Sequence, residues 1–332
     1  MLTVGLIGAG RIGRVHASTI VQDEGSQLVA VADSVDENAK NLAKLYKVNP
    51  RSVDAIFEDN SIEAILIASS TDTHSDFIEK ASKAGKAILC EKPVDLSLAR
   101  AKRCLENTKS NEHSIMMGFN RRFDPNFVAL KNALDGGEIG TAELLSITSF
   151  DPAPPPIDYV KVSGGIFKDM MIHDFDMANF LYGELPKSVF VSASAIIDKK
   201  IGALGDYDTA VATLKYRDGR LAVIKNSRRA TYGYDQRIEV LGSKGLLQVQ
   251  NMVENSMVKS TEMGVESSKP EYFFLERYKS DYQNEWAAFV TAVKTKTPMP
   301  VSLSDGIAAL AIAEAAAASA EMGSEVEIAN FL

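Results

Sequence analysis

Three titratable side chains recur at helical spacing within a largely apolar segment, residues 164–181. Asp169, His173 and Asp176 lie at i, i+4 and i+7, so at about 100° per residue they share one helical face, whereas Asp174 points away from it. Most of the remaining positions are apolar, which predicts a buried helix. Buried carboxylates and imidazoles are costly unless they are paired or used, so this helix indicates a functional site. A core histidine satisfied by its neighbours is the alternative.

A glycine pattern near the N-terminus predicts a dinucleotide site. It follows the apolar run of residues 4–7, opens a helix, and comprises Gly8, Gly10, Arg11, Ile12 and Gly13. Glycines at this spacing allow a tight turn and let backbone N–H groups approach a pyrophosphate. Asp33 ends the next apolar run, where its carboxylate can bind both ribose hydroxyls. Its charge would repel a 2′-phosphate, and the next residue is Ser34 rather than arginine, so the sequence predicts NAD rather than NADP.

Two further runs of polar residues follow predicted strands of the same domain. The first contains Ser69, Ser70, Thr71 and His74, and the second is Glu91-Lys92-Pro93. Because ligands of doubly wound sheets bind at the carboxyl ends of the strands, we expect both runs to contact the cofactor. For His74, capping or packing at the start of its helix is the alternative. Lys92 is expected to bind a substrate hydroxyl or to take part in proton transfer.

The elements that must position these residues divide the chain into two domains. Residues 1–120 alternate apolar runs with helical segments, which predicts a Rossmann-type, doubly wound parallel α/β sheet. The expected strands are residues 2–7, 28–32, 64–68, 87–90 and 115–117, and the expected helices are 12–22, 37–46, 73–84 and 97–107.

Beyond residue 120 the pattern predicts an α+β domain with a mostly antiparallel open sheet, residues 121–332. The expected strands are 144–148, 188–195, 209–216, 221–226, 237–241 and 246–250. The segment with Asp169 and His173 is the main helix against this sheet, and residues 151–156 form a stiff proline-rich loop. Residues 280–295 and 304–321 are helical again, and the C-terminal helix can pack back on the first domain.

Composition narrows the class of partner. The net charge is −8 and no run of Lys or Arg stands out, so we expect neither a nucleic-acid nor a membrane partner. The two cysteines, Cys90 and Cys104, are too few for a disulfide framework and fit a reducing compartment, by default the cytoplasm. The N-terminus enters a strand directly, without the features of a secretion signal, and no apolar run approaches a membrane span.

Together, the glycine pattern, Asp33, the Glu91-Lys92-Pro93 signature and the Asp169-x-x-x-His173 helix resemble the glucose-fructose oxidoreductase/inositol dehydrogenase (Gfo/Idh/MocA) family. The resemblance covers essentially the whole chain, and the inositol dehydrogenase branch is most similar in residues 118–124, 151–156, 163–177 and 232–240. It implies hydride transfer from a ring alcohol to NAD, most simply from myo-inositol to give 2-keto-myo-inositol, with Lys92, Asp169 and His173 matching the family's catalytic residues. It also implies a homotetramer formed through the C-terminal sheets, and a cis Lys92–Pro93 peptide bond.

Alcohol oxidation requires a base for the hydroxyl proton. Histidine has an ordinary pKa of about 6.5, so a neutral imidazole at His173 suits this role, and Asp169 can orient the ring. Lys92 would stabilise the developing alkoxide charge. The other hydroxyls of a polyol need partners, for which the candidates are Arg121, Asp151, Asp176 and Tyr232. Alternative assignments concern Tyr234, which could replace Tyr232, and Arg122, Arg228 and Arg229, which could form structural ion pairs instead.

Three other interpretations remain open. Asp169 and His173 have the spacing of zinc ligands, but no third ligand is evident, so we expect no metal. A regulator that binds NAD without turning over a substrate is a second possibility, although the chain retains Lys92, Asp169 and His173 together. The third changes only the substrate, to scyllo-inositol, chiro-inositol or an aldose such as glucose, because one altered hydroxyl contact can change the preference.

Overall fold

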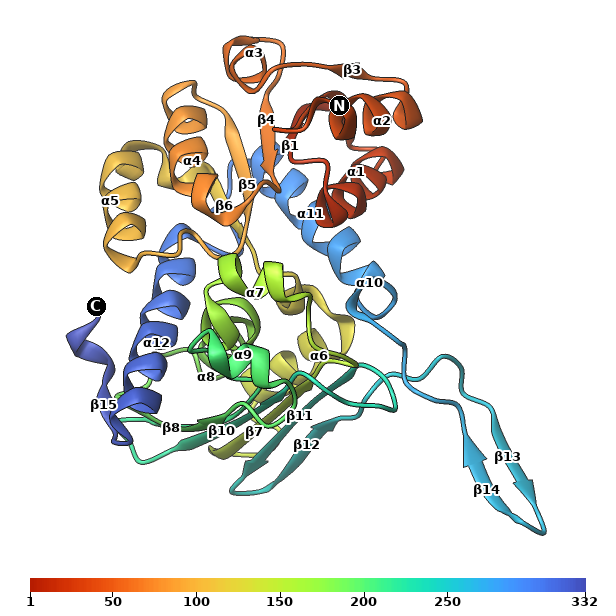
Figure 1. Ribbon diagram of the computed structural model, residues 1–332, viewed down its shortest axis with the longest axis vertical. Helices are drawn as coiled ribbons and strands as arrows, with labels where there is room; N and C mark the ends of the chain where they lie inside the picture. Colours follow the sequence, from red (N-terminus) through yellow and green to blue (C-terminus); the bar gives the residue numbers. More distant parts are fainter. The chain divides into compact units, whose positions relative to one another are not determined.

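A six-stranded parallel sheet lies in the first of two structural units in the computed structural model, which describes residues 1–332 (Figure 1). This unit 1 contains Met1–Phe123 and Ser280–Leu310. The sheet order is β3-β2-β1-β4-β5-β6, the order of a doubly wound dinucleotide-binding fold, as predicted. Its strands are β1 (Leu2–Ile7), β2 (Ser26–Ala32), β3 (Asn49–Pro50), β4 (Ala64–Ile67), β5 (Ala87–Glu91) and β6 (Ile115–Gly118).

Helices alternate with these strands along the chain. They are α1 (Arg11–Gln22), α2 (Asp36–Tyr46), α3 (Val53–Glu58), α4 (His74–Lys83) and α5 (Leu98–Thr108), with short 3-10 segments at Thr71–Thr73, Lys109–Ser114 and Asn120–Phe123. Every residue of β4, β5 and β6 is buried. Parallel strands that are covered on both faces read as continuous apolar runs, which is why the sequence located them.

Helix α11 (Lys279–Thr295) belongs almost entirely to unit 1, although the sequence analysis assigned residues 121–332 to the second domain. The indole Nε1 of Trp286 donates a hydrogen bond to Ser26 Oγ of β2 at 2.9 Å, and Trp286 and Phe289 are buried. A long-range aromatic contact of this kind leaves no local signal in the sequence. Helix α12 (Leu303–Met322) follows and continues into unit 2.

The second unit contains Asp124–Lys279 and Ala311–Leu332 and is built on a seven-stranded sheet. The sheet order is β12-β11-β7-β10-β9-β8-β15, and all neighbours are antiparallel except the parallel pair β7 and β10. Its strands are β7 (Ala142–Phe150), β8 (Ser188–Ser194), β9 (Thr209–Lys215), β10 (Leu221–Ser227), β11 (Asp235–Gly242), β12 (Gly245–Val249) and β15 (Val326–Glu327). The mostly antiparallel sheet is therefore confirmed.

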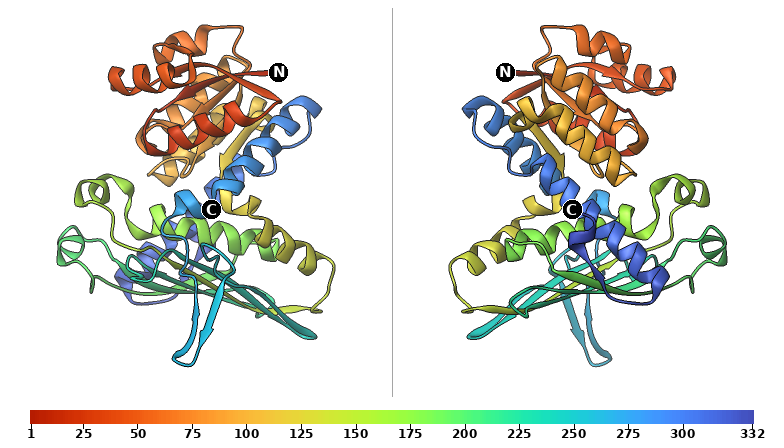
Figure 2. Two further views of the ribbon diagram at one scale, coloured as in Figure 1. Left: turned by 90° about the vertical axis from the view of Figure 1, so that its right-hand side faces the viewer. Right: turned by 90° about the vertical axis from the view of Figure 1, so that its left-hand side faces the viewer.

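Helices cover one face of this sheet, and Figure 2 shows the other face bare. The helical segments are α6 (Pro125–Asp135), α7 (Ile157–Ser163), a π-helical turn (Phe167–Met171), α8 (Ile172–Tyr182), α9 (Lys199–Ala203), α10 (Phe274–Arg277) and a 3-10 turn (Ile328–Asn330). Phe167, Met171 and Phe175 pack with the inward-facing residues of β7 to β11 in one hydrophobic core. The helical elements of the predicted segment, which begin at Phe167, are mostly buried, as expected.

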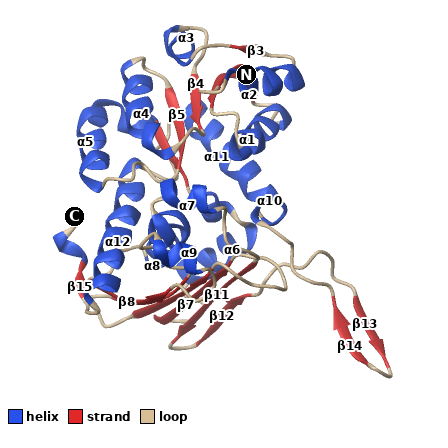
Figure 3. Ribbon diagram, in the orientation of Figure 1, coloured by secondary structure: helices blue, strands red, loops and turns tan.

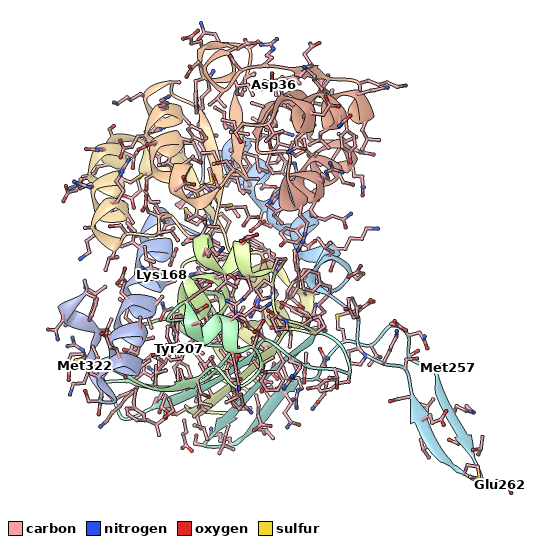
Figure 4. All side chains as sticks on the ribbon, in the orientation of Figure 1. Asp36, Lys168, Tyr207, Met257, Glu262 and Met322 are labelled. Carbon is pink, nitrogen blue, oxygen red and sulfur yellow. The ribbon has the colours of Figure 1, made fainter.

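A two-stranded hairpin, β13 (Val258–Thr261) and β14 (Gly264–Ser267), pairs with neither larger sheet and projects from unit 2 (Figure 3). Its side chains are exposed, and Met257 and Glu262 are labelled along it in Figure 4. The sequence analysis did not identify this hairpin, because it lacks the alternation of buried and exposed positions that marks a packed strand.

Helix α12 bears on the expectation that no apolar run approaches a membrane span. It is the one helix of the chain long and apolar enough to cross a membrane by length and composition, with a mean hydropathy of 1.3 over its best window. However, 61% of that window is buried inside the protein, and Ile312, Ala313, Ala315 and Ala316 belong to the core of unit 2. A core helix passes the same test, so this finding is weak evidence for a membrane span.

Candidate functional site

The glycine loop of unit 1 joins β1 to α1, and its three glycines have different reasons to lack a side chain. A Cβ on Gly8, which has φ 105°, would collide with the carbonyl of Ala68, and a Cβ on Gly13 would collide with the carbonyl of Gly8. A Cβ on Gly10 would meet no protein atom within 4 Å. Gly8 and Gly13 therefore serve the turn, whereas Gly10 keeps open the space in front of the helix N-terminus.

Helix α1 begins at Arg11, has no side-chain cap at Gly10 and carries no acidic residue in its first turn. Its N-terminus therefore retains the positive end of the helix dipole, which favours a bound phosphate. Ile12 is the second residue of this turn and is partly buried.

Asp33 is fixed next to the glycine loop by backbone donors. Its Oδ2 accepts a hydrogen bond from Ala9 N at 2.6 Å, and its Oδ1 accepts one from Val35 N at 2.8 Å. Asn38 Nδ2 lies 3.5 Å from the same Oδ1. A carboxylate oriented in this way at the end of β2 has the position and charge needed to bind ribose hydroxyls, so the residues fit the NAD that the sequence predicts.

The loops after β4 and β5 are joined through His74. Its Nδ1 lies 2.8 Å from the carbonyl of Pro93 and its Nε2 lies 3.1 Å from the carbonyl of Ser69. Burial lowers the pKa of His74 below its ordinary value, so its ring is neutral at pH 7. The ring therefore ties two loops together, which is the packing role given above as the alternative. Ser69 Oγ and Thr73 Oγ1 lie 2.7 Å apart, and Ser70 and Thr71 lead into the short 3-10 turn before α4.

Lys92 follows β5 directly, and the Lys92–Pro93 peptide bond is cis, as the resemblance implied. Lys92 is partly buried, whereas Glu91 before it is buried. Glu91 Oε1 lies 2.6 Å from Nε2 of the buried His16 on α1. The backbone that carries Lys92 is thus tied to the helix that follows the glycine loop.

In unit 2, the predicted regular helix at residues 164–181 is interrupted. A π-helical turn, Phe167–Met171, precedes α8, which begins at Ile172. The assumption of 100° per residue therefore fails between Asp169 and His173, although it holds for His173 and Asp176 within α8. π-Helical turns inside helices are frequent at functional sites, and a single sequence gave no signal of this one.

Asp169 has two identified partners within unit 2. Tyr159 of α7 donates its hydroxyl to Asp169 Oδ1 at 2.8 Å, and Arg228 Nη2 lies 3.5 Å from Asp169 Oδ2. The ion pair of Arg228 matches the structural alternative stated for it. Tyr159 was not among the predicted site residues, because an exposed tyrosine on a short helix has no distinguishing pattern.

Asp151 lies at the same edge of the sheet as Arg228, because each follows the end of one strand of the parallel pair. Ser227 of β10 is in register with Phe150 of β7. Asp151 N donates to Ser227 O at 2.9 Å, and Asp151 O accepts from Ala230 N at 2.7 Å. The structure thus brings Asp151 to the strand end that carries the partner of Asp169, while His173 is partly buried on α8.

The two other acids of α8 are buried. Asp174 accepts hydrogen bonds from Ser149 Oγ at 2.6 Å and from Asn226 Nδ2 at 2.7 Å, so it faces the sheet, away from the predicted functional face. Asp176 is buried one helical turn after His173. The sequence analysis did not foresee that Asp174 anchors the helix to β7 and β10.

The remaining predicted substrate residues, Arg121 and Tyr232, belong to different units. Arg121 is buried in unit 1 on the 3-10 turn Asn120–Phe123, and its neighbour Arg122 forms an ion pair with Asp305 at 3.2 Å. Tyr232 of unit 2 is exposed and donates its hydroxyl to Asp235 Oδ2 at 2.6 Å. Partial burial and the Asp235 carboxylate raise the pKa of Tyr232 to about 12, so it stays a hydrogen-bond donor.

Comparison with known proteins agrees with this arrangement. Residues 2–119 match the family model described as "Oxidoreductase family, NAD-binding Rossmann fold", and residues 127–248 match the GFO/IDH/MocA C-terminal domain. An inositol 2-dehydrogenase of Rhizobium meliloti (strain 1021) is 48% identical over 325 residues, which cover 98% of each chain.

Two solved structures extend the comparison. A myo-inositol dehydrogenase from Corynebacterium glutamicum is 40% identical with a TM-score of 0.95, and 98% of each chain is covered. A myo-inositol dehydrogenase from Lactobacillus casei in complex with NAD(H) and myo-inositol is 26% identical with a TM-score of 0.89, covering 98% of this chain and 96% of that one.

The fold of unit 1, the glycine loop and Asp33 define an NAD-binding oxidoreductase with a second, α+β unit. The chain belongs to the Gfo/Idh/MocA family, as the resemblance in its sequence indicated.

Proposed function

We propose that this protein oxidises one ring CH–OH group of a cyclic polyol, most simply myo-inositol to 2-keto-myo-inositol, with NAD as the hydride acceptor. The observation that carries the proposal is the full-length similarity to an inositol 2-dehydrogenase, in a chain that has both the NAD-type loop with Asp33 and the helix with Asp169 and His173. The structure of a relative in complex with NAD(H) and myo-inositol supports the same pairing of cofactor and substrate.

In the proposed mechanism the ring carbon loses hydride and its hydroxyl loses a proton. NAD, when bound, supplies the hydride acceptor at C4 of the nicotinamide. His173 accepts the hydroxyl proton as general base, and Asp169 orients the imidazole and stabilises the imidazolium. Lys92 stabilises the negative charge that develops on the oxygen.

Polar side chains bind the remaining hydroxyls. Carboxylates accept hydrogen bonds from hydroxyls, and guanidinium and phenol groups donate to them. We assign these contacts to Arg121, Asp151, Asp176 and Tyr232. For Asp151, support comes from its position at the strand end beside Arg228, the partner of Asp169.

For the cofactor, contacts are assigned to Gly8, Gly10, Arg11, Ile12, Gly13, Asp33, Ser69, Ser70, Thr71, His74, Glu91 and Lys92. The open space at Gly10 and the fixed carboxylate of Asp33 support this set. For His74 and Glu91 the buried contacts favour an indirect contribution, through the loops that they hold in place.

The test is a panel of polyols and aldoses, assayed with NAD and with NADP by the absorbance of the reduced nicotinamide. We expect the highest kcat/KM with NAD and myo-inositol, and lower values with scyllo-inositol, chiro-inositol and glucose. NAD binding without reduction by any member of the panel would support a non-catalytic regulator and overturn the proposal.

The same assay tests whether activity depends on a metal ion. The structure contains no group of three or more His, Cys, Asp or Glu side chains arranged to hold a metal ion. We therefore expect activity to be insensitive to a chelator. Activity lost with the chelator and restored by a divalent cation would contradict this expectation.

We further propose that the protein is a cytoplasmic homotetramer that associates through the bare face of the seven-stranded sheet. A row of four leucines supports this interface, because strand register aligns Leu246, Leu241, Leu144 and Leu221 on neighbouring strands. All four are exposed on this face. Exposed apolar rows of this kind mark protein interfaces more often than solvated surfaces.

A further inference from the structure

The Asp169 carboxylate is held by two groups from different elements of unit 2. Tyr159 of α7 donates to Oδ1 at 2.8 Å, and Arg228, just beyond β10, places Nη2 3.5 Å from Oδ2. We propose that Tyr159 and Arg228 are positioning residues that fix this carboxylate for its work with His173. The inference rests on the proposed function, and it adds two residues to the machinery assigned there.

Arg228 is an unusual choice if it served stability alone. Its side chain is only 1% exposed, and its Nε and Nη2 make no hydrogen bond. Burying a guanidinium with unsatisfied donors costs free energy, and a well-packed apolar residue would stabilise this position equally well or better. The cation is therefore better explained by the carboxylate that it faces.

The position from which Arg228 reaches Asp169 is fixed by the sheet. The Arg228 backbone N–H donates a hydrogen bond to Asp208 O at 2.8 Å, which fixes the backbone of Arg228 at the end of β10. The Asp208 carboxylate does not compete for the guanidinium, because it accepts the backbone N–H groups of Ile196, Ile197 and Asp198 at 2.8–3.0 Å. Asp169 is the acid to which Arg228 is paired.

The other charged groups around the π-helical turn have different partners. Lys168 pairs with Glu314 of α12 at 2.8 Å, and Figure 4 labels Lys168. Asp206 accepts from Ile166 N at 2.9 Å, and Asp174 is bound to the sheet. His173 lies near the start of α8, and in the proposed mechanism Asp169 orients its ring. Tyr159 and Arg228, by contrast, both contact the Asp169 carboxylate.

A cation beside an acid–imidazole pair makes the pair's last proton easier to lose, whichever member carries it. His173 can act as a base only after that proton has left. Removal of the Arg228 charge should therefore move the acid limb of the kcat profile to higher pH. Loss of the Tyr159 hydroxyl should act in the same direction, because its hydrogen bond favours the ionised carboxylate.

The experiment compares Arg228→Met, Arg228→Lys and Tyr159→Phe with Arg229→Met, a matched control at the exposed neighbouring arginine. We expect kcat to fall on the order of 100-fold in Arg228→Met and about 10-fold in Tyr159→Phe, with the acid limb shifted upward by up to about one pH unit. Arg228→Lys keeps the charge, so it should retain the position of the limb and recover part of kcat. Arg229→Met should behave as wild type, and NAD affinity should not change in any variant.

An acid limb at its wild-type position in Tyr159→Phe and Arg228→Met would overturn the proposal, as would an equal loss in Arg229→Met. If Arg228→Met fails to fold, Tyr159→Phe decides the outcome, because Tyr159 is 47% exposed and its loss should not threaten the core. Asp169→Asn and His173→Ala separate this inference from the proposed function. Turnover retained in those two variants would refute the assigned chemistry, whereas turnover lost in them with a wild-type profile in Tyr159→Phe and Arg228→Met would refute only the positioning role.

Discussion

Three aspartates within eight residues of one segment show that partners, rather than residue type, determine what an acid does. Asp174 is saturated by buried donors on the sheet and serves as an anchor. The Asp169 carboxylate contacts the Tyr159 hydroxyl and the Arg228 guanidinium. Spacing alone separated Asp174 from the other two, whereas the contact of Arg228 with Asp169 is evident only in the structure.

His173 is the residue on which the proposed chemistry depends most. His173→Ala should lower kcat by about 10²- to 10⁴-fold, the usual contribution of a general base, and should leave NAD affinity unchanged. Steady-state kinetics and NAD titration measure both quantities. His113→Ala, at an exposed histidine of unit 1, is the control and should be neutral. Unchanged turnover in His173→Ala would remove this residue from the mechanism.

Asp33 is the residue to which we assign the choice between NAD and NADP. Asp33→Ser combined with Ser34→Arg removes the charge that repels a 2′-phosphate and adds one that attracts it. We expect the ratio of kcat/KM for NADP to that for NAD to rise by at least about tenfold, as measured in parallel assays with one polyol. The Ser34→Arg single variant is the control for added charge alone. If the ratio stays at its wild-type value, the ribose is recognised elsewhere.

We expect Glu285 to make the stability of unit 1 depend on pH. It is fully buried on α11, and both carboxylate oxygens make no hydrogen bond. Burial, followed by the charges of Glu91 and Asp281, raises the pKa of Glu285 well above its ordinary value. A pKa that is higher in the folded state favours folding at low pH, and this stability is lost as the pH rises toward the folded pKa.

Glu285→Gln should therefore flatten the pH dependence of unfolding, because an amide of the same shape stays neutral throughout. We expect the Tm of the variant relative to wild type to increase between about pH 5 and about pH 8, as followed by calorimetry. Glu106→Gln, at an exposed glutamate of α5, should run parallel to wild type. A wild-type slope in Glu285→Gln would show that this carboxyl is not held neutral.

At the scale of elements, the sequence located what repeats locally. The buried strands β1, β4 and β5, the helices α1, α2 and α4 and the strands β7 to β12 fall close to their predicted ranges, whereas the short helix α3 was not predicted. Each of these segments has its own hydrophobic periodicity, so it can be predicted without knowledge of the segments that pack against it. Helix α6 mixes buried and exposed positions without a clear period, and the strands β13 and β14 are wholly exposed. Neither α6 nor this hairpin was predicted from the sequence.

The π-helical turn marks the limit of sequence reasoning about the site. Phe167 and Met171 of this turn pack into the core with residues of β10. Such long-range packing cannot be predicted from the spacing of residues within the segment. The residue types Lys92, Asp169 and His173 could be chosen from the sequence, and so could their place on a buried helix and a strand end. Tyr159 and Arg228 could not, because their roles arise from contacts between α7, the π-helical turn and β10.

The contribution of the buried Asp174 to the attachment of helix α8 can be tested. Asp174→Ala leaves the Ser149 and Asn226 donors without their acceptor, so the free energy of unfolding should fall by about 2–4 kcal/mol. Denaturant titration measures this loss. Asp158→Ala, at the exposed start of α7, should change stability by less than about 0.5 kcal/mol. Equal stability in both variants would mean that the helix is held by its apolar face alone.

At the scale of the whole molecule, the chain enters each unit twice. Ser280–Leu310 returns to unit 1 after the whole of the seven-stranded sheet except β15 has been made, and α12 then carries the chain into unit 2 again. The sequence indicated one boundary near residue 120 and allowed the C-terminal helix to return to the first domain, but the return of α11 rests on long-range contacts that no local pattern reveals. Each unit buries its own core, but the outer face of the large sheet stays uncovered within one chain.

That uncovered face provides the test of assembly. Leu144→Glu combined with Leu241→Glu places two carboxylates at the centre of the leucine row, since strand register sets these residues opposite each other. Burying both charges in an apolar contact is strongly unfavourable, so the proposed tetramer should dissociate into smaller species while each chain stays folded. Light scattering after size-exclusion chromatography measures the mass, and circular dichroism reports folding. Leu45→Glu, at a leucine of α2 that is 68% exposed, is the matched control and should keep the wild-type mass. If the double variant also keeps that mass, the subunits associate through another surface.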